Sequence, residues 1–128
     1  WGLCNDGKNL IMSNGDSEIV WRNPRTFEMV KTIEVFDHSK SVGNLNELEL
    51  IGGDLYMNIY QDSKLAQVDT ATGRVLAYID CRVLVNDAQD IGNDVLNGIA
   101  YNPETDKIYL TGKLWPKLYE VKFELWAD

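Results

Sequence analysis

The sequence predicts an all-β fold of the β-propeller class, and three observations support this prediction. Short runs rich in Ile, Val, Leu and Tyr alternate with polar turn segments along the chain, which is typical of antiparallel strands. A multi-strand pattern recurs after about 45 to 53 residues, and four strands in a repeat of that length are typical of a propeller blade. Helical periodicity is weak throughout, so we expect few helices.

The repeat units share one order of elements: a strand, a loop, a second strand, a polar turn and a third strand. The predicted segments are residues 9–15, 19–26 and 30–35 in the first unit, 54–60, 65–73 and 75–79 in the second, and 107–113 and 118–123 in the third. The turns are Asn23-Pro-Arg-Thr26 and Asp69-Thr-Ala-Thr-Gly73, which consist of residue types that turns favour. The third unit ends after its second strand.

One more short strand precedes each unit, at residues 1–3, 46–48 and 97–99, which gives four strands per complete unit. Residues 1–128 then form one partial propeller domain of fewer than three blades, whereas a closed propeller needs at least about four. The chain opens on Trp1-Gly2-Leu3 with neither Met nor a signal segment, which indicates a piece of a longer protein. Its open sheet edges favour self-association or pairing with missing N-terminal blades.

Two segments between the strands are expected to be loops. Residues 36–43 contain the single histidine, His38, which we interpret as a solvated loop residue. Residues 83–95 are rich in Asp and Asn and predict a long loop, with one helical turn as an alternative.

The charge and the cysteine count exclude several classes of function. The net charge is −8 with a pI near 4.5, so the basic face that nucleic acid or an anionic membrane needs is missing. No apolar run approaches the ~20 residues of a membrane span. Two cysteines and one histidine are too few for a usual zinc site. We interpret Cys4 and Cys81 as buried apolar residues, with a disulfide between them, or a Cys–His nucleophile pair, as alternatives.

Equivalent positions of the repeats converge in a propeller, and here they hold polar and aromatic residues. One position holds Trp1, Asn46 and Asn97, and the other holds Gly15, Tyr60 and Lys113. An indole, carboxamides, a phenol and an ammonium together are typical of a pocket for a small polar ligand. The alternative is structural, with buried asparagines joining neighbouring strands and the tryptophan filling the channel.

Four strings at these positions resemble the glutaminyl cyclases of plants and many bacteria. They are Trp1-Gly2-Leu3 followed by Asp6-Gly7, Leu45-Asn-Glu-Leu-Glu49, Val95-Leu-Asn-Gly-Ile-Ala-Tyr101 and Thr111-Gly-Lys-Leu-Trp-Pro116. Their order and approximate spacing match that family over essentially the whole chain. The resemblance implies a five-bladed propeller, of which this chain is the C-terminal part.

The resemblance also implies an activity, the cyclisation of an N-terminal glutamine of a peptide to pyroglutamate with release of ammonia. The α-amine attacks the side-chain amide carbon, so an enzyme must hold the glutamine curled and stabilise the developing oxyanion. No cofactor and no catalytic metal are implied. The partner is then a peptide or protein with an N-terminal glutamine, and the expected location is secreted or periplasmic.

The resemblance assigns roles to Trp1, Asn46, Tyr60 and Lys113, and the repeat alignment adds Asn97. Asn46 and Lys113 correspond to catalytic residues, the first as a hydrogen-bond partner of the substrate amide and the second as a lysine facing the pocket. Trp1, Tyr60 and Asn97 are expected to bind substrate. Tyr60 stands where the family usually has Trp, so it keeps an aromatic wall but adds a hydroxyl.

The general acid/base expected from the family is a glutamate in an earlier blade, outside this sequence. Glu47 and Glu49 are local alternatives, but strand alternation turns them away from the Asn46 face, so we interpret them as partners of the backbone or of a neighbouring blade. Asp90 and Asp94 are interpreted as solvated. If the upstream glutamate is absent, the second hypothesis is a non-catalytic propeller that binds peptides or scaffolds partners.

Overall fold

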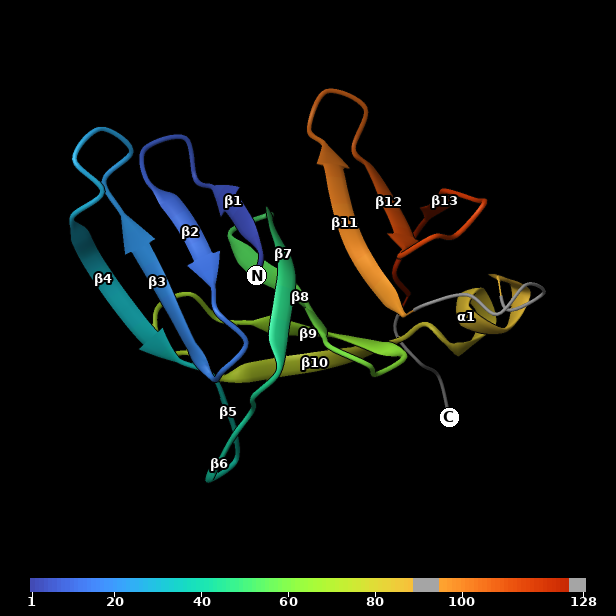
Figure 1. The fold of residues 1–128 in the computed structure, drawn as a ribbon, viewed down its shortest axis with the longest axis horizontal. Helices are drawn as coiled ribbons and strands as arrows, with labels where there is room; N and C mark the ends of the chain where they lie inside the picture. The colour runs from blue at the N-terminus through green and yellow to red at the C-terminus, as the bar shows by residue number, and fades with distance from the viewer. Residues whose placement is uncertain (89–94, 125–128) are drawn as a thin grey trace.

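The computed structural model describes residues 1–88 and 95–124 and shows an all-β architecture with one short helix (Figure 1). Among the described residues, three larger sheets follow one another along the chain, and a two-stranded hairpin lies between the first and second of them in sequence. Within each sheet, strands that are consecutive in sequence pair antiparallel. The all-β prediction is therefore confirmed.

The first sheet corresponds to the first predicted unit and its preceding strand. Its strands are β1 (Leu3–Asn5), β2 (Leu10–Ser13), β3 (Glu18–Arg22) and β4 (Met29–Glu34). The predicted turn after β3 is present, because the Phe27 N–H donates to the Asn23 carbonyl oxygen at 2.8 Å. The Asn23 side chain also accepts from the N–H groups of Arg25 and Thr26, which fixes the turn.

The second sheet likewise has four strands. They are β7 (Leu45–Ile51), β8 (Asp54–Ile59), β9 (Lys64–Val68) and β10 (Val75–Asp80). The predicted turn before β10 is closed by the Gly73 N–H, which donates to the Asp69 carbonyl oxygen at 2.8 Å. β7 is longer than expected and has an irregular register between Leu45 and Leu48, which is the mark of a β-bulge.

The third sheet has three strands, as the early end of the third unit predicts. They are β11 (Leu96–Asn102), β12 (Lys107–Gly112) and β13 (Tyr119–Val121). β7 contacts both β1 and β11, so the first strands of the three sheets adjoin each other in chain order.

Two expected loops contain regular structure. Within residues 36–43 the short strands β5 (Phe36–Asp37) and β6 (Lys40–Ser41) form a hairpin, and His38 lies at its tip with a positive φ of 57°. The His38 side chain is 95% exposed, which confirms the solvated interpretation.

Helix α1 (Arg82–Ala88) replaces the first part of the loop expected over residues 83–95. The Asp80 side chain accepts from the Arg82 N–H at its start, and Leu84 and Val85 pack on the core of the third sheet. This apolar packing stabilises a segment whose Asp and Asn content favours a loop. Asp90 and Asp94 lie outside the described residues.

Two hydrophobic clusters connect the sheets. The first combines side chains of the first and second sheets, with Ile11, Leu48 and Met57 among its members, and it includes Cys4. The second combines the second and third sheets and includes Cys81. Both thiols are buried and free, so the alternative of a Cys4–Cys81 disulfide is wrong. No helix among the described residues is long and apolar enough to cross a membrane.

Candidate active site

Three of the predicted site residues form one cluster. The rings of Trp1 and Tyr60 pack edge to face, with centroids 5.5 Å apart and an interplanar angle of 69°. The Lys113 Nζ atom lies 3.3 Å from the Tyr60 hydroxyl oxygen and 4.8 Å from the centre of its ring. Trp1 is 65% exposed, so this aromatic–lysine cluster (Trp1, Tyr60 and Lys113) is open to a ligand from solvent.

Tyr60 and Lys113 occupy equivalent positions in the second and third sheets. Each follows the second strand of its sheet. The Tyr60 N–H donates to the Asn44 carbonyl oxygen at 2.7 Å, and the Lys113 N–H donates to that of Val95 at 2.9 Å. Asn44 and Val95 each immediately precede the first strand of their sheet, so the predicted repeat alignment is confirmed for Tyr60 and Lys113.

The first sheet contributes Trp1, although not through the predicted equivalence. Cys4 holds in β1 the buried position that Leu48 holds in β7. Two residues earlier stand Gly2 in the first sheet and Asn46 in the second, so the predicted equivalence of Trp1 with Asn46 is wrong by one residue. The register of β7 is irregular at this point, so equivalent positions cannot be counted from sequence spacing. The backbones of Gly2 and Asn46 also approach closely, because a Cβ atom on Gly2 would lie 2.3 Å from the Asn46 carbonyl oxygen.

Gly15 provides the surface on which the Trp1 ring rests. Its φ is 94°, and a Cβ atom on it would lie 2.5 Å from two atoms of the indole. A non-glycine residue would therefore be strained and would displace the ring. The Trp1 backbone nitrogen donates to the Ser13 carbonyl oxygen at 2.9 Å, which fixes the other side of the residue.

Asn46 lies in β7 with its backbone hydrogen-bonded and with no described hydrogen-bond partner for its side chain. It is 6% exposed, and its carbonyl oxygen accepts from the Ser13 hydroxyl at 2.7 Å. Among the described residues, no hydrogen bond engages its carboxamide. A carboxamide has two donors and an acceptor, so Asn46 can bind a ligand amide without breaking an existing bond.

Asn97 joins neighbouring strands, as the structural alternative for the asparagines predicts. Its Oδ1 atom accepts from the Glu47 N–H at 3.4 Å and joins β11 to β7. Asn58, which sequence reasoning missed, makes the reverse contact: it is fully buried and its Oδ1 atom accepts from the Gly98 N–H at 3.1 Å. The sequence signal that could have identified Asn58 is its position next to Met57 in an apolar strand. A polar residue in a buried strand needs a hydrogen-bond partner.

Glu47 and Glu49 lie beside this junction of β7 and β11. Burial raises the pKa of Glu47, while the N–H groups of Leu48 and Ile99 donate to its carboxylate and oppose the rise. Burial also raises the pKa of Glu49, and the Glu47 carboxylate adds to the effect. The Leu48 N–H donates to the Glu47 carboxylate at 3.1 Å, so Glu47 is a partner of backbone, as expected from the sequence. The alternation argument does not apply at Glu47, because the β7 bulge interrupts the alternation.

The described residues offer no other set of reactive side chains near the cluster. Over residues 1–88 and 95–124, no three His, Cys, Asp or Glu side chains gather as metal ligands. Burial raises the pKa of the Cys4 thiol to about 12, and the Glu49 and Glu47 carboxylates contribute. Cys4 is therefore a packing residue rather than a nucleophile.

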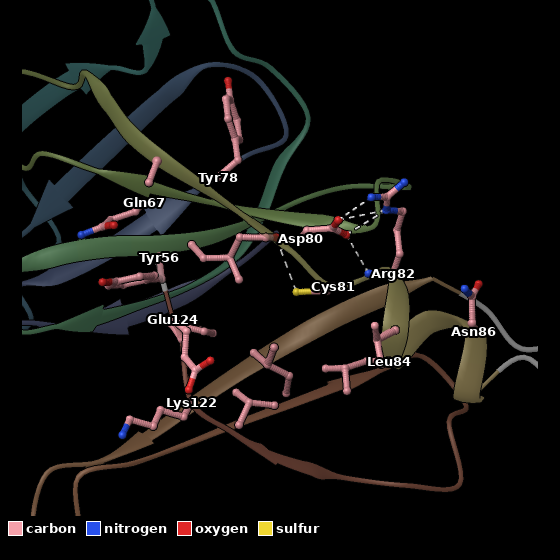
Figure 2. Close-up of a pocket in the computed structure, with 16 residues that line it drawn as sticks. Tyr56, Gln67, Tyr78, Asp80, Cys81, Arg82, Leu84, Asn86, Lys122 and Glu124 are labelled. Carbon is pink, nitrogen blue, oxygen red and sulfur yellow. Dashed lines mark hydrogen bonds and ion pairs between the residues drawn. The ribbon is translucent and has the colours of Figure 1, made fainter. Parts of the chain in front are cut away.

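A separate cavity of about 940 Å³ lies between β10, α1 and the chain after β13 (Figure 2). Apolar side chains such as Leu84 and Phe123 form much of its wall, and Asp80 pairs with Arg82 at 2.7 Å on one side. It shares no residue with the aromatic–lysine cluster and contains neither Asn46 nor Asn97. The chemistry predicted from the sequence therefore lies elsewhere.

The comparisons with known proteins agree on one family. Residues 1–123 match the family described as Glutamine cyclotransferase. The chain is 35% identical over 127 residues to the Glutaminyl-peptide cyclotransferase of Arabidopsis thaliana, a match that covers 97% of this chain and 40% of that protein.

Solved structures give the same result. The glutaminyl cyclase of Myxococcus xanthus superposes with a TM-score of 0.91 and 38% identity, over 95% of this chain and 54% of that one. A Bacteroides caccae protein of unknown function shares the fold at 12% identity, with a TM-score of 0.58. The chain thus spans about half or less of its named relatives. With a family match over nearly its whole length, the chain belongs to the glutamine cyclotransferase family.

Proposed function

We propose that the protein containing this chain is a glutaminyl-peptide cyclotransferase that converts N-terminal glutamine to pyroglutamate. The observation that carries the proposal is the aromatic–lysine cluster of Trp1, Tyr60 and Lys113. The carboxamide of Asn46, which no described residue hydrogen-bonds, adds an amide-binding group in β7. This set of groups fits a small, neutral, amide-bearing ligand. The named relatives, a glutaminyl-peptide cyclotransferase and a glutaminyl cyclase, support the same reaction.

The reaction needs little besides positioning and electrostatics. The α-amine nitrogen bonds to the side-chain amide carbon, the bond from that carbon to the amide nitrogen breaks, and ammonia leaves. One proton moves from the attacking nitrogen to the leaving nitrogen. Holding amine and amide together in a curled conformation removes much of the entropic barrier.

Each residue has a role in this proposal. Trp1 and Tyr60 enclose the apolar part of the glutamine side chain. Asn46 hydrogen-bonds the side-chain amide, and the Asn97 carboxamide nitrogen faces substrate while its oxygen holds β7. The Lys113 ammonium raises the local positive potential, which favours the neutral, nucleophilic form of the substrate amine.

We further propose that the chain is the C-terminal part of a five-bladed propeller in a secreted or periplasmic protein. Its partial coverage of both relatives supports this, as do exposed apolar side chains on the first sheet. Leu3, Met29 and Val30 are each more than half exposed, which suits packing by an earlier blade or by a second copy. The general acid/base is then a glutamate from the missing blades.

The test is conversion of a Gln-initiated peptide by the full-length protein, followed by ammonia release and by mass. The control peptide begins with Asn, whose shorter side chain would have to close a four-membered ring. Ammonia and pyroglutamate from the Gln peptide alone support the proposal. Binding of the Gln peptide without turnover would instead favour a non-catalytic peptide-binding propeller.

A further inference from the structure

The Tyr60 hydroxyl has a hydrogen-bond donor that the described residues leave unused. A lysine ammonium only donates hydrogen bonds, so in the 3.3 Å contact Lys113 Nζ is the donor and the Tyr60 oxygen is the acceptor. The Tyr60 O–H therefore retains its own proton for another acceptor. Within residues 1–88 and 95–124 that hydroxyl makes no second hydrogen bond.

Contacts to the Tyr60 ring hold the phenol in place. Trp1 contacts Tyr60 edge to face at 5.5 Å between centroids, and the Lys113 ammonium lies 4.8 Å from the centre of the Tyr60 ring. A phenol that accepts a hydrogen bond from a cation is polarised, so its own O–H becomes a stronger donor. A preset, polarised donor is the kind of group that stabilises a developing negative charge.

On the basis of the function proposed above, we propose that the Tyr60 hydroxyl donates a hydrogen bond to the carbonyl oxygen of the substrate side-chain amide. That oxygen gains the electron pair of the C=O bond when the α-amine attacks, and the resulting oxyanion accepts from Tyr60. When the oxyanion collapses, the C=O bond re-forms and the bond to the leaving nitrogen breaks. Tyr60 keeps its proton throughout, and the proton for ammonia comes from the attacking amine.

This role assigns Tyr60 to catalysis as well as to the wall of the pocket. Its ring would contact ground state and transition state alike, whereas a hydrogen bond to the oxyanion strengthens as charge develops. Only the second kind of interaction raises kcat. The two contributions can therefore be separated by removing the hydroxyl alone.

The experiment compares full-length wild type with Tyr60→Phe on a Gln-initiated peptide. Loss of one oxyanion donor is expected to lower kcat by ~10²-fold with little change in KM. Tyr60→Trp, which keeps a ring and an N–H donor, should fall between the two. Tyr101→Phe is the matched control, because its hydroxyl bonds Asp106 in the β11–β12 hairpin, and it should keep wild-type kinetics.

A second substrate distinguishes catalysis from structure. In a peptide whose first residue carries a γ-thioamide, sulfur replaces the oxygen and accepts hydrogen bonds weakly. The Tyr60→Phe penalty should then shrink by at least several-fold. Equal penalties for both substrates would overturn this inference but not the proposed function. The same holds if wild type turns over the peptide and Tyr60→Phe is equally active. A full-length wild type without turnover would overturn the proposed function and the inference together.

Discussion

The Lys113 ammonium nitrogen lies 3.3 Å from the Tyr60 hydroxyl oxygen, although the two residues are 53 positions apart and extend from different sheets. Packing of β7 against β11 brings their loops together. The candidate site is therefore a product of the junction between sheets. Residues that fix this junction should influence activity even where they cannot touch a substrate.

Asn58 is the first such residue to test. Asn58→Ala removes the fully buried acceptor of the Gly98 N–H, and an unsatisfied donor away from water costs about 1–3 kcal/mol. We expect urea unfolding of the full-length protein to show this loss. Asn97→Ala should cost less, because its bond is longer, at 3.4 Å, and Asn97 is half-buried whereas Asn58 is fully buried. The reverse order of the two stabilities would contradict the account of the junction.

Gly15→Ala should damage the site through the Trp1 ring. The substitution strains a residue with φ of 94° and places a Cβ atom 2.5 Å from the indole, and strain of this kind costs about 1–3 kcal/mol. Gly7→Ala is the matched control, since Gly7 has φ of 87° but no neighbour within 4 Å of the added Cβ.

Both glycine variants are expected to lose stability, whereas Gly15→Ala alone should lose turnover of a Gln-initiated peptide. Calorimetry and steady-state kinetics on the full-length protein measure the two effects. If Gly7→Ala and Gly15→Ala lowered kcat/KM equally, Trp1 would have no specific part in the site.

The strands and turns were predicted well from the sequence because each repeat unit contains the residue types that form them. Asn23 and Asp69 close their turns as expected, since both belong to residue types that form turns by local hydrogen bonds. Helix α1 was expected only as an alternative helical turn within a loop, because its stability comes from packing Leu84 and Val85 on another sheet. Local composition carries no information about that contact.

The site was predicted less completely, because it depends on register. Tyr60 and Lys113 were paired correctly, since their loops are equivalent in the two later sheets. Trp1 was aligned with Asn46, whereas the residue whose backbone approaches Asn46 is Gly2, and this close approach is visible only in three dimensions. The β7 bulge likewise has no marker in the sequence, and it invalidated the alternation argument for Glu47.

Glu47 makes stability depend on pH in a predictable direction. Burial raises its pKa above the ordinary value of 4.5, so the folded chain holds this proton to a higher pH than the unfolded chain does. The associated stability is complete below the unfolded pKa and is lost as pH rises through the folded pKa. Glu47→Gln stays neutral and keeps an acceptor for the Ile99 N–H.

Urea unfolding of the full-length protein at pH 4 and pH 7 measures this effect. Glu47→Gln is expected to gain stability relative to wild type as the pH rises from 4 to 7. A constant difference, or one that changes in the opposite direction, would show that the folded protein does not raise the pKa of Glu47.

The substitution Asn46→Ala distinguishes a catalytic role of Asn46 from a structural one. Its backbone carbonyl makes the bond to Ser13, so Asn46→Ala should leave that bond intact and change stability little. Loss of a donor to the reacting amide is expected to lower kcat/KM by ~10²-fold. Near-normal turnover together with a lower melting temperature would assign Asn46 to the junction of the sheets instead.

The most direct test of the proposed glutaminyl cyclase site is kcat/KM of the full-length protein on a Gln-initiated peptide, measured for wild type, Lys113→Ala and Lys117→Ala. Both variants remove one ammonium from the same loop, but Lys117 pairs with Asp87 at 3.1 Å, away from the cluster. The account predicts ammonia release by wild type, a loss of at least ~10-fold for Lys113→Ala and no comparable loss for Lys117→Ala. Turnover unchanged in a folded Lys113→Ala variant would contradict it.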